Sequence, residues 1–204
     1  MPKDTFFNLD PDKQQRVIDA AIREFESHTY EEAKLSRIIK DADIARGSFY
    51  QYFEDKLDLY RHLFDRIAQD KLAYLGNDLN NPDEISFIEL FRRLYKRGVL
   101  FANEHPEYIR ITRNLMLNRG TTVFKEILGE NYDLGRQYYK QYIEIDKQHG
   151  RIREDVDSDI LADFILDTTT TIAFNELTHD DSLDLDKMFN RMEQMLNILQ
   201  KGIQ

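Results

Sequence analysis

The stretch IARGSFYQYFEDK, residues 44–56, gathers small, cationic and aromatic side chains within one short segment. Arg46 offers a planar fork of donors that fits a guanine edge or a phosphate. Gly47 has no side chain, so the backbone beside it can approach a phosphate closely, and Ser48 adds a hydroxyl. Tyr50 combines a flat body that packs with a hydroxyl that reaches a phosphate oxygen. The mixture indicates contact with duplex nucleic acid.

The other residues of this stretch divide between packing and a further phosphate contact. Phe49 and Phe53 are four residues apart on one helical face, and we assign them, with Tyr52, to the core. Lys56 begins the next helix and is predicted to anchor the phosphate backbone. Aromatic residues alone are usually core and a lone lysine is usually solvated. Small and basic residues on one shared face favour the DNA-binding interpretation.

The elements that must position these residues are short helices. Asp10 stands before a proline and predicts an N-cap, with an amphipathic helix over 11–27. A second helix begins at Leu35. Asp43 is predicted to be a turn residue, because a short polar side chain tolerates left-handed backbone angles, and a third helix follows over 45–51. Two short helices joined by a tight turn have the dimensions of a helix-turn-helix, whose second helix enters the major groove.

Helical periodicity continues through the rest of the chain, and no strand alternation or internal repeat interrupts it. A helix from about 56 to 76 is followed by a loop rich in Gly, Asn and Pro, which predicts the domain boundary. Further helices are expected over 83–104, 106–117, 121–147, 158–178 and 184–201. The sequence therefore predicts an all-α protein with residues 1–56 as one domain, 56–76 as a connecting helix and 77–204 as a second domain.

Composition excludes several classes of protein. The chain of 204 residues is 41% hydrophobic and 32% charged, has no cysteine and carries a net charge of −10. Its apolar runs are too short to span a membrane, and its first residues lack the apolar stretch of a signal peptide. We therefore expect a cytoplasmic protein with no membrane association. Its five histidines have no zinc-site spacing, so no metal or cofactor is expected.

The charge balance also constrains the DNA-binding interpretation. Residues 1–56 contain nine Lys or Arg and twelve Asp or Glu. Bulk attraction therefore cannot hold DNA here. Phosphate contact must come from the placement of individual cations.

The segment FESHTYEEAKLSRIIKDADIARGSFYQYFEDKLDLY resembles the N-terminal domain of TetR-type (TetR/AcrR) transcriptional regulators. The matching positions are Phe25, Tyr30, Ile38, Ala42, Arg46, Gly47, Tyr50, Tyr52, Phe53, Lys56 and Leu59. Thr29 and Asp43 stand where the family commonly has glycine, and Ala33 and Ala45 stand where it has hydroxyl residues. The alanine at the helix cap loses a phosphate-contacting hydroxyl, which Lys34 could replace.

The resemblance implies an N-terminal three-helix helix-turn-helix domain and a C-terminal helical domain for ligand binding and dimerisation. It implies a repressor that binds an inverted-repeat operator in double-stranded DNA as a homodimer and is released by a small-molecule effector. The DNA-contacting residues would be Lys34, Arg46, Gly47, Ser48, Tyr50 and Lys56. An activator is the alternative, since the operator's position decides between the two.

Two further residue sets follow from the resemblance. Candidates for the ligand pocket are Tyr108, Asn114, Met116, Tyr138, Tyr142, Thr168 and Thr171. Candidates for the dimer interface are Ile160, Phe164, Ile172, Met188, Met192 and Met195. Both sets have a simpler interpretation, because aromatic and apolar stripes at helical spacing also close a monomer's own core, and threonine hydroxyls can bond the preceding helical turn.

Other functions have weaker support in the sequence. An enzyme is not expected, because the chain shows no Gly-rich phosphate loop, nucleophile signature or paired-histidine motif. A helical adaptor that binds other proteins would fit the acidity and the exposed charge. Such an adaptor would not need Arg46, Gly47 and Tyr50 on one face.

Overall fold

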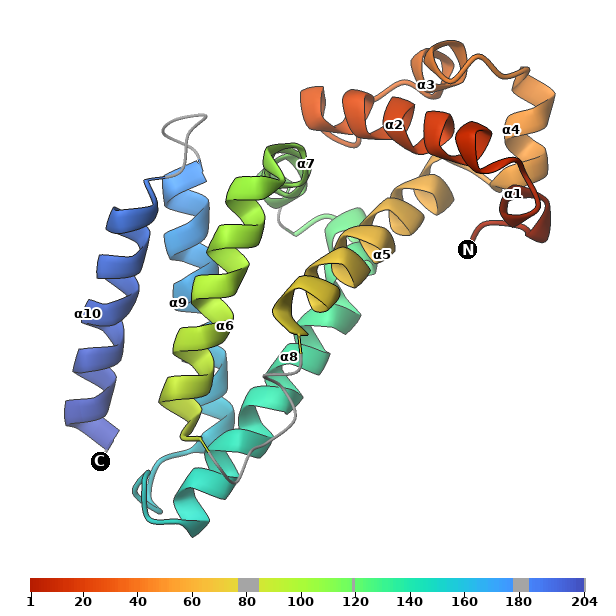
Figure 1. Ribbon diagram of the computed structural model, residues 1–204. Helices are drawn as coiled ribbons and strands as arrows, with labels where there is room; N and C mark the ends of the chain where they lie inside the picture. Colours follow the sequence, from red (N-terminus) through yellow and green to blue (C-terminus); the bar gives the residue numbers. More distant parts are fainter. Residues whose placement is uncertain (77–84, 119, 178–183, 204) are drawn as a thin grey trace. The chain divides into compact units, whose positions relative to one another are not determined.

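The computed structural model describes residues 1–76, 85–118, 120–177 and 184–203, and in these ranges all regular structure is helical (Figure 1). The helices are α1 (Asp4–Phe7), α2 (Pro11–Ser27), α3 (Leu35–Asp41), α4 (Arg46–Tyr52), α5 (Lys56–Leu75), α6 (Phe87–Glu104), α7 (Pro106–Leu117), α8 (Thr122–Gln148), α9 (Ser158–Leu177) and α10 (Leu185–Ile203). The all-α prediction is confirmed, and the bounds of most predicted helices are confirmed to within a few residues. The predicted boundary loop after residue 76 lies outside the described residues. None of the described helices has the length and apolarity needed to cross a membrane.

The chain forms two compact units. Unit 1 comprises residues 1–71 and 105–127, and unit 2 comprises 72–104 and 128–204. α7 therefore groups with the N-terminal helices, although the predicted domain division assigned it to the second domain. That functional division stays a prediction.

α2 supplies the central face of unit 1. Its N-terminus is closed by Asp10, whose carboxylate accepts the Asp12 N–H at 2.9 Å, with proline at the first helical position as predicted. Val17, Ile18 and Phe25 recur at helical spacing and are buried. The Phe25 ring lies 4.5 Å from that of Tyr60 on α5, so an aromatic contact joins α2 to α5.

The turn between α3 and α4 is fixed by backbone hydrogen bonds. Asp43 has φ of 52°, in the left-handed region predicted for it. Its N–H donates to Lys40 O at 3.2 Å, and the Ile44 N–H donates to Ile39 O at 3.2 Å. This pair of bonds is the Schellman arrangement that ends a helix. An aspartate therefore closes α3 where glycine is common in the family that the segment resembles.

The N-terminus of α3 is held by a carboxylate from another helix. The first residues of α3 make no capping hydrogen bond of their own. Glu24 of α2 instead accepts the Lys34 N–H at 2.6 Å and bonds the Arg37 guanidinium, with the shortest nitrogen–oxygen distance 2.5 Å. Burial alone would raise the pKa of Glu24, but the hydrogen bonds from Arg37 and Lys34 outweigh it and hold that pKa below its usual value. Glu24 thus bonds the backbone of Lys34, which the structure places at the N-cap of α3 where the sequence predicted Ala33.

α7 is joined to the C-terminal end of α2 by polar side chains one turn apart. The Asn114 amide donates to the carbonyls of Phe25 and Glu26 at 3.0 Å each and to that of His28 at 3.3 Å. One turn before it, Arg110 pairs with Glu26 at 2.7 Å. One turn after it, Asn118 donates to the Glu31 carboxylate at 2.7 Å. Because the last carbonyls of a helix have no partner within the helix, Asn114 completes the end of α2.

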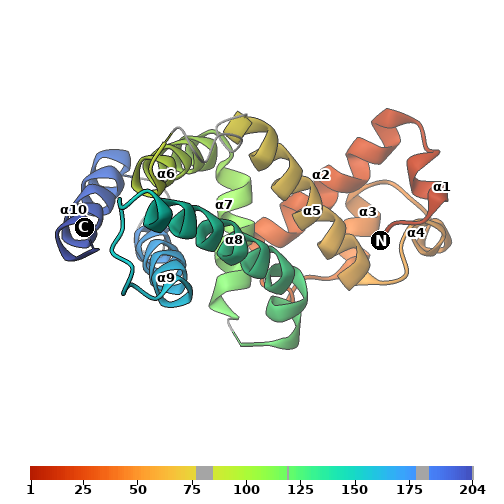
Figure 2. The ribbon, with the colours of Figure 1, turned by 90° about the horizontal axis from the view of Figure 1, so that it is seen from below.

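Unit 2 is built around the packed faces of α6, α8, α9 and α10, whose arrangement can be followed from below in Figure 2. Its buried core comprises Phe87, Ile88, Leu90, Phe91, Tyr142, Ile143, Ile152, Leu161, Ala162, Ile165, Ile172, Met192, Met195 and Leu196. Buried Asp146 accepts the Phe87 N–H at 2.9 Å and so closes the start of α6.

α8 and α9 are linked by side-chain pairs spaced four residues apart in each helix. Tyr132 donates to Asp167, Arg136 pairs with Asp163 at 2.7 Å, and Lys140 pairs with Asp159 at 2.6 Å. This spacing keeps the pairs on one face of each helix. Asp159, Asp163 and Asp167 of α9 are therefore matched by donors of α8.

Replacing Glu24 tests how much this carboxylate contributes to unit 1. Glu24→Gln should lower the free energy of unfolding at pH 7 by about 1–3 kcal/mol, because it removes charge-assisted hydrogen bonds at a buried site. A lowered folded-state pKa means that the stabilisation is present above the unfolded pKa, about 4.3, and is lost as the pH falls through the folded-state value. The difference from wild type, measured by urea denaturation, should therefore shrink as the pH falls below the unfolded value. Exposed Glu54 provides the control, Glu54→Gln, and an equal loss in both variants would contradict the capping role.

Candidate nucleic-acid interface

α4 has a buried side and an exposed edge. Phe49, Tyr52 and Phe53 are buried, as the packing interpretation expects, and the rings of Phe49 and Phe53 stack with centroids 5.4 Å apart. Arg46 and Tyr50 are exposed. The predicted division of this stretch into an apolar back and a polar front is therefore present in the structure.

The N-terminal end of α4 is open to an approaching backbone. Arg46 is its first residue, and the space in front of Gly47 is empty, since a Cβ built there would meet no atom within 4 Å. Ser48 is half-buried one residue further on. The space at Gly47 is therefore open to a phosphate.

The local charge differs in sign from that of the whole chain. Residues 34–52 contain four cations, Lys34, Arg37, Lys40 and Arg46, and only two carboxylates. One carboxylate, Asp41, pairs with Arg23 of α2 at 2.6 Å. The helix-turn-helix segment is thus locally positive although residues 1–56 are net negative.

Two of the predicted contacts depend on the helix starts. The Lys34 side chain is exposed at the start of α3, where a replacement phosphate contact was predicted. Ala45 precedes α4 and forms no side-chain cap. Lys40 is exposed in the last turn of α3 and is a further candidate for phosphate contact that the predicted set omits. Its place beside the turn is what identifies it as a candidate.

Lys56 is engaged inside unit 1. Its ammonium donates to the carbonyls of Tyr30 at 2.5 Å and Ala33 at 2.8 Å and lies 4.3 Å from the centre of the Tyr30 ring. Burial lowers the pKa of Lys56, and the nearby Glu31 and Glu24 carboxylates oppose that shift. These bonds favour a role in positioning the segment before α3. The phosphate contact stays a prediction.

The predicted ligand-pocket residues are divided between the two units. Tyr108, Asn114 and Met116 lie on α7 in unit 1, where the Tyr108 hydroxyl donates to Asp70 at 2.9 Å and Asn114 caps α2. Burial, aided by that hydrogen bond, raises the pKa of Tyr108 to about 12. Asn114 and Tyr108 therefore have structural partners that sequence periodicity could not reveal.

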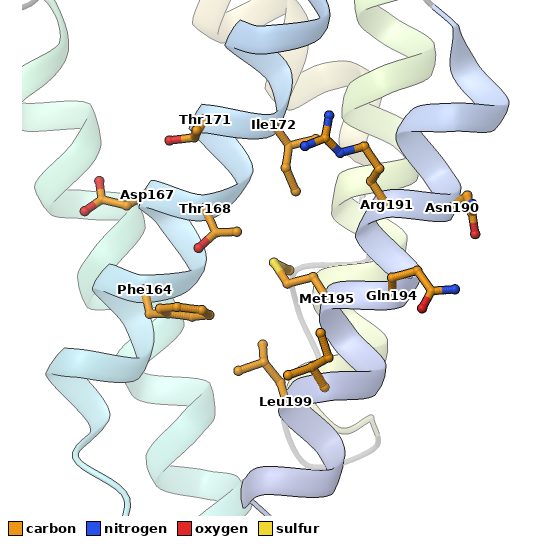
Figure 3. A pocket seen from close by; sticks show the side chains of 11 residues that line it. Phe164, Asp167, Thr168, Thr171, Ile172, Asn190, Arg191, Gln194, Met195 and Leu199 are labelled. Carbon is orange, nitrogen blue, oxygen red and sulfur yellow. The ribbon is translucent and has the colours of Figure 1, made fainter.

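The remaining pocket candidates lie in unit 2. Tyr142 is buried in the core with its ring 5.0 Å from that of Tyr138, and burial raises the pKa of Tyr138 well above its usual value. Thr168 and Thr171 instead line a groove of about 610 Å³ between α9 and α10. Figure 3 shows Phe164 and Thr168 of α9 pointing towards Met195 and Leu199 of α10.

The predicted dimer residues fall into two groups. Ile160 and Phe164 are 68% and 50% exposed, and Ile198, which lines the groove together with Phe164, is 73% exposed. The others, Ile172, Met188, Met192 and Met195, are buried within unit 2. The core interpretation therefore describes the buried group, whereas the exposed group leaves an apolar surface on α9 and α10.

The described residues contain no group of three or more His, Cys, Asp or Glu side chains arranged to hold a metal ion. What the geometry does provide is a rigid turn between two short helices, with an open, locally positive edge on the second. Such an edge can receive the phosphate backbone and the base edges of a major groove.

Comparisons with known proteins agree with this geometry. Residues 17–63 match the model of the tetR family of bacterial regulatory proteins. The fatty acid metabolism regulator protein of Bacillus subtilis is 23% identical over 191 residues, which cover 90% of this chain and 93% of that protein. A TetR family transcriptional regulator from Chloroflexus aurantiacus has a similar structure, with a TM-score of 0.71, 26% identity and coverage of 100% of this chain and 98% of that one.

A second similar structure contains a ligand. FadR from Bacillus subtilis, in complex with stearoyl-CoA, has a TM-score of 0.75 and 20% identity, with coverage of 89% of this chain and 96% of that one. These relatives are transcriptional regulators, not enzymes. Residues 17–63 are therefore a DNA-binding domain of the type found in the tetR family of bacterial regulatory proteins, and the chain is a DNA-binding transcriptional regulator whose helix-turn-helix is formed by α3 and α4.

Proposed function

We propose that this regulator is a cytoplasmic, homodimeric repressor that binds an inverted-repeat operator and is released by a fatty acyl ligand. The observation that carries the proposal is the exposed edge of α4, which holds Arg46, Gly47 and Tyr50. The opposite side of this helix is buried through Phe49 and Tyr52. At the start of α4, which follows a Schellman turn, an arginine stands beside a glycine with open space in front of it. The adaptor and enzyme hypotheses do not explain this arrangement. Base contact by Arg46 and phosphate contact by Lys34 and Tyr50 account for the arrangement.

The groove between α9 and α10 supports dimerisation. Exposed Ile160, Phe164 and Ile198 would lose contact with water if the same surface of a second copy covered them. Three acidic residues of α9 are engaged by α8, which reduces the charge that a partner would have to desolvate. Two copies joined here would present two α4 helices, and an inverted repeat requires them about 34–36 Å apart.

Release by a ligand needs a connection between unit 2 and the DNA-binding helices, and α7 supplies one. Polar contacts with the end of α2 hold α7 in unit 1. α7 lies in the segment 105–127 of unit 1, and the chain before and after this segment, at residues 104 and 128, belongs to unit 2. A change in unit 2 that displaces those ends would act on α2. A coupling of about 1–3 kcal/mol is typical of such linked sites.

The ligand class is suggested by the relatives. One is a fatty acid metabolism regulator, and the FadR structure contains stearoyl-CoA. Unit 2 has a core of apolar and aromatic side chains that includes Phe91 and Tyr142. The residues that would line such a site stay a prediction.

Arg46→Ala tests direct base readout. Selection of bound fragments from random duplex DNA by wild type should recover an inverted repeat. On that repeat the variant should lose about 1–3 kcal/mol and accept other bases at one position per half-site, because it lacks the bidentate donor. Arg153→Ala changes an exposed arginine of unit 2 and should bind like wild type. Unchanged base preference in the Arg46 variant would contradict the assignment.

Ile198→Asp tests the dimer surface. The side chain is mostly exposed within one chain, so the variant should fold, but a charge buried between two copies would be unpaired and costly. Sedimentation velocity should show a shift from dimer to monomer and gel-shift titration a weaker complex with the full repeat. Leu134→Asp alters an exposed apolar residue on α8 that does not line the groove, and this variant should remain dimeric. If both variants remain dimeric, the interface lies elsewhere.

Stearoyl-CoA tests the ligand class. Added to the complex with a fluorescent operator, it should weaken binding by about 5–150-fold, the range that typical coupling energies give. Coenzyme A and stearate separately should have much smaller effects, since each supplies half of the contacts. Equal release by stearate would identify a free fatty acid as the effector, and no release by any of them would remove the fatty acyl proposal.

A further inference from the structure

The C-terminal end of α4 is closed by residues from the beginning of the chain. A helix leaves its last four carbonyls without helical partners, and in α4 these belong to Phe49, Tyr50, Gln51 and Tyr52. Only the Phe49 carbonyl is served locally, by the Phe53 N–H at 2.9 Å. The other three therefore need donors from elsewhere.

Two residues provide those three donors. The Lys3 N–H donates to Tyr52 O at 2.8 Å, and the Lys3 ammonium donates to Tyr50 O at 3.0 Å. The Thr5 hydroxyl donates to Gln51 O. All four carbonyls of the last turn are thus bonded, and the Lys3 cation lies at the end of the helix where the dipole is negative.

The same segment is anchored by packing and by α2. Phe6 is 2% exposed, and its ring centroid lies 4.8 Å from that of Phe53 and 5.4 Å from that of His62. The Gln14 amide of α2 donates to the carbonyls of Phe7 at 3.1 Å and Leu9 at 2.9 Å. The donors that reach α4 are therefore fixed to the framework of unit 1 rather than carried by a free arm.

We propose that residues 3–7, the N-terminal clamp, are a positioning element for DNA recognition that fixes α4 by bonding the carbonyls of its last turn. The family match begins at residue 17, so the clamp lies outside the segment that the family model describes. Isolated helices as short as α4 are unstable in water. The orientation of Arg46 and Tyr50 consequently depends on what holds the ends of α4. The effect of the clamp on DNA recognition rests on the proposed function. Its effect on the stability of α4 can be measured without DNA.

Hydrogen exchange in the free protein tests the clamp directly. In the double variant Lys3→Met with Thr5→Val, which keeps the bulk of both side chains, the amides of residues 50–53 should exchange about tenfold faster because two stabilising hydrogen bonds are lost. Lys3→Arg, with Thr5 intact, keeps a cationic donor and should retain most of the protection. Lys201→Met, an exposed lysine of α10, is the matched control. Unchanged protection of residues 50–53 in the double variant would overturn the proposal.

DNA binding separates a positioning role from a direct phosphate contact. The double variant should lose preference for the selected repeat over random DNA by about tenfold, with the salt dependence unchanged. A phosphate contact by Lys3 would instead reduce the slope of log affinity against log salt by about 0.9 and weaken all sequences alike, and with unchanged protection that result would refute the clamp. If wild type prefers no sequence, the repressor proposal fails, while the exchange result still decides whether the clamp holds α4.

Discussion

The DNA-reading part of unit 1 depends on how the ends of the seven-residue helix α4 are held. Such a helix forms few internal hydrogen bonds, and their free energy does not offset the unfavourable free energy of nucleating the helix. α4 therefore persists only because other segments pack its aromatic side and bond its free carbonyls. α3, equally short, has its N-terminus bonded by Glu24 of α2 and its C-terminus closed by the turn at Asp43. Both helices of the DNA-reading motif are stabilised from outside themselves, so their geometry belongs to the whole unit.

An acidic chain can present a positive edge because its carboxylates are used internally. Glu24 binds Arg37 and the start of α3, Glu26 binds Arg110, and Asp41 binds Arg23. Each pair cancels one carboxylate against one arginine, and Lys34, Lys40 and Arg46 are not among the cations used in this way. Electrostatic attraction acts over roughly 8–10 Å in physiological salt, so the sign near α4 matters more to binding than the net charge of −10.

Sequence periodicity predicted the long helices well because their apolar faces repeat over many turns. The N-cap at Asp10 and the turn at Asp43 were predicted from residue type, because a short polar side chain can bond the nearby backbone or adopt left-handed angles. α1 was missed, since four residues are too few to show a period. The partners of Lys56 and Asn114 were also beyond the sequence: each bonds backbone carbonyls that lie more than twenty residues away in the chain. A residue type indicates which chemistry a side chain can perform, and only the fold decides which atoms it meets. For the same reason, the predicted pocket residues divide among α7, the core of unit 2 and the groove.

The polar residues of unit 1 can be sorted by what their side chains bond. Lys3, Thr5, Glu24, Lys56 and Asn114 all bond backbone groups that a helix end or a loop leaves without partners. A side chain committed to the backbone in this way cannot turn to DNA without exposing an unsatisfied group, which costs about 1–3 kcal/mol. Within the part of the chain that the structure describes, the exposed side chains of Lys34, Arg46 and Tyr50 form no such bond to a backbone group. Base and phosphate contacts should therefore come first from this second group, and the first group should act on affinity through the placement of α3 and α4.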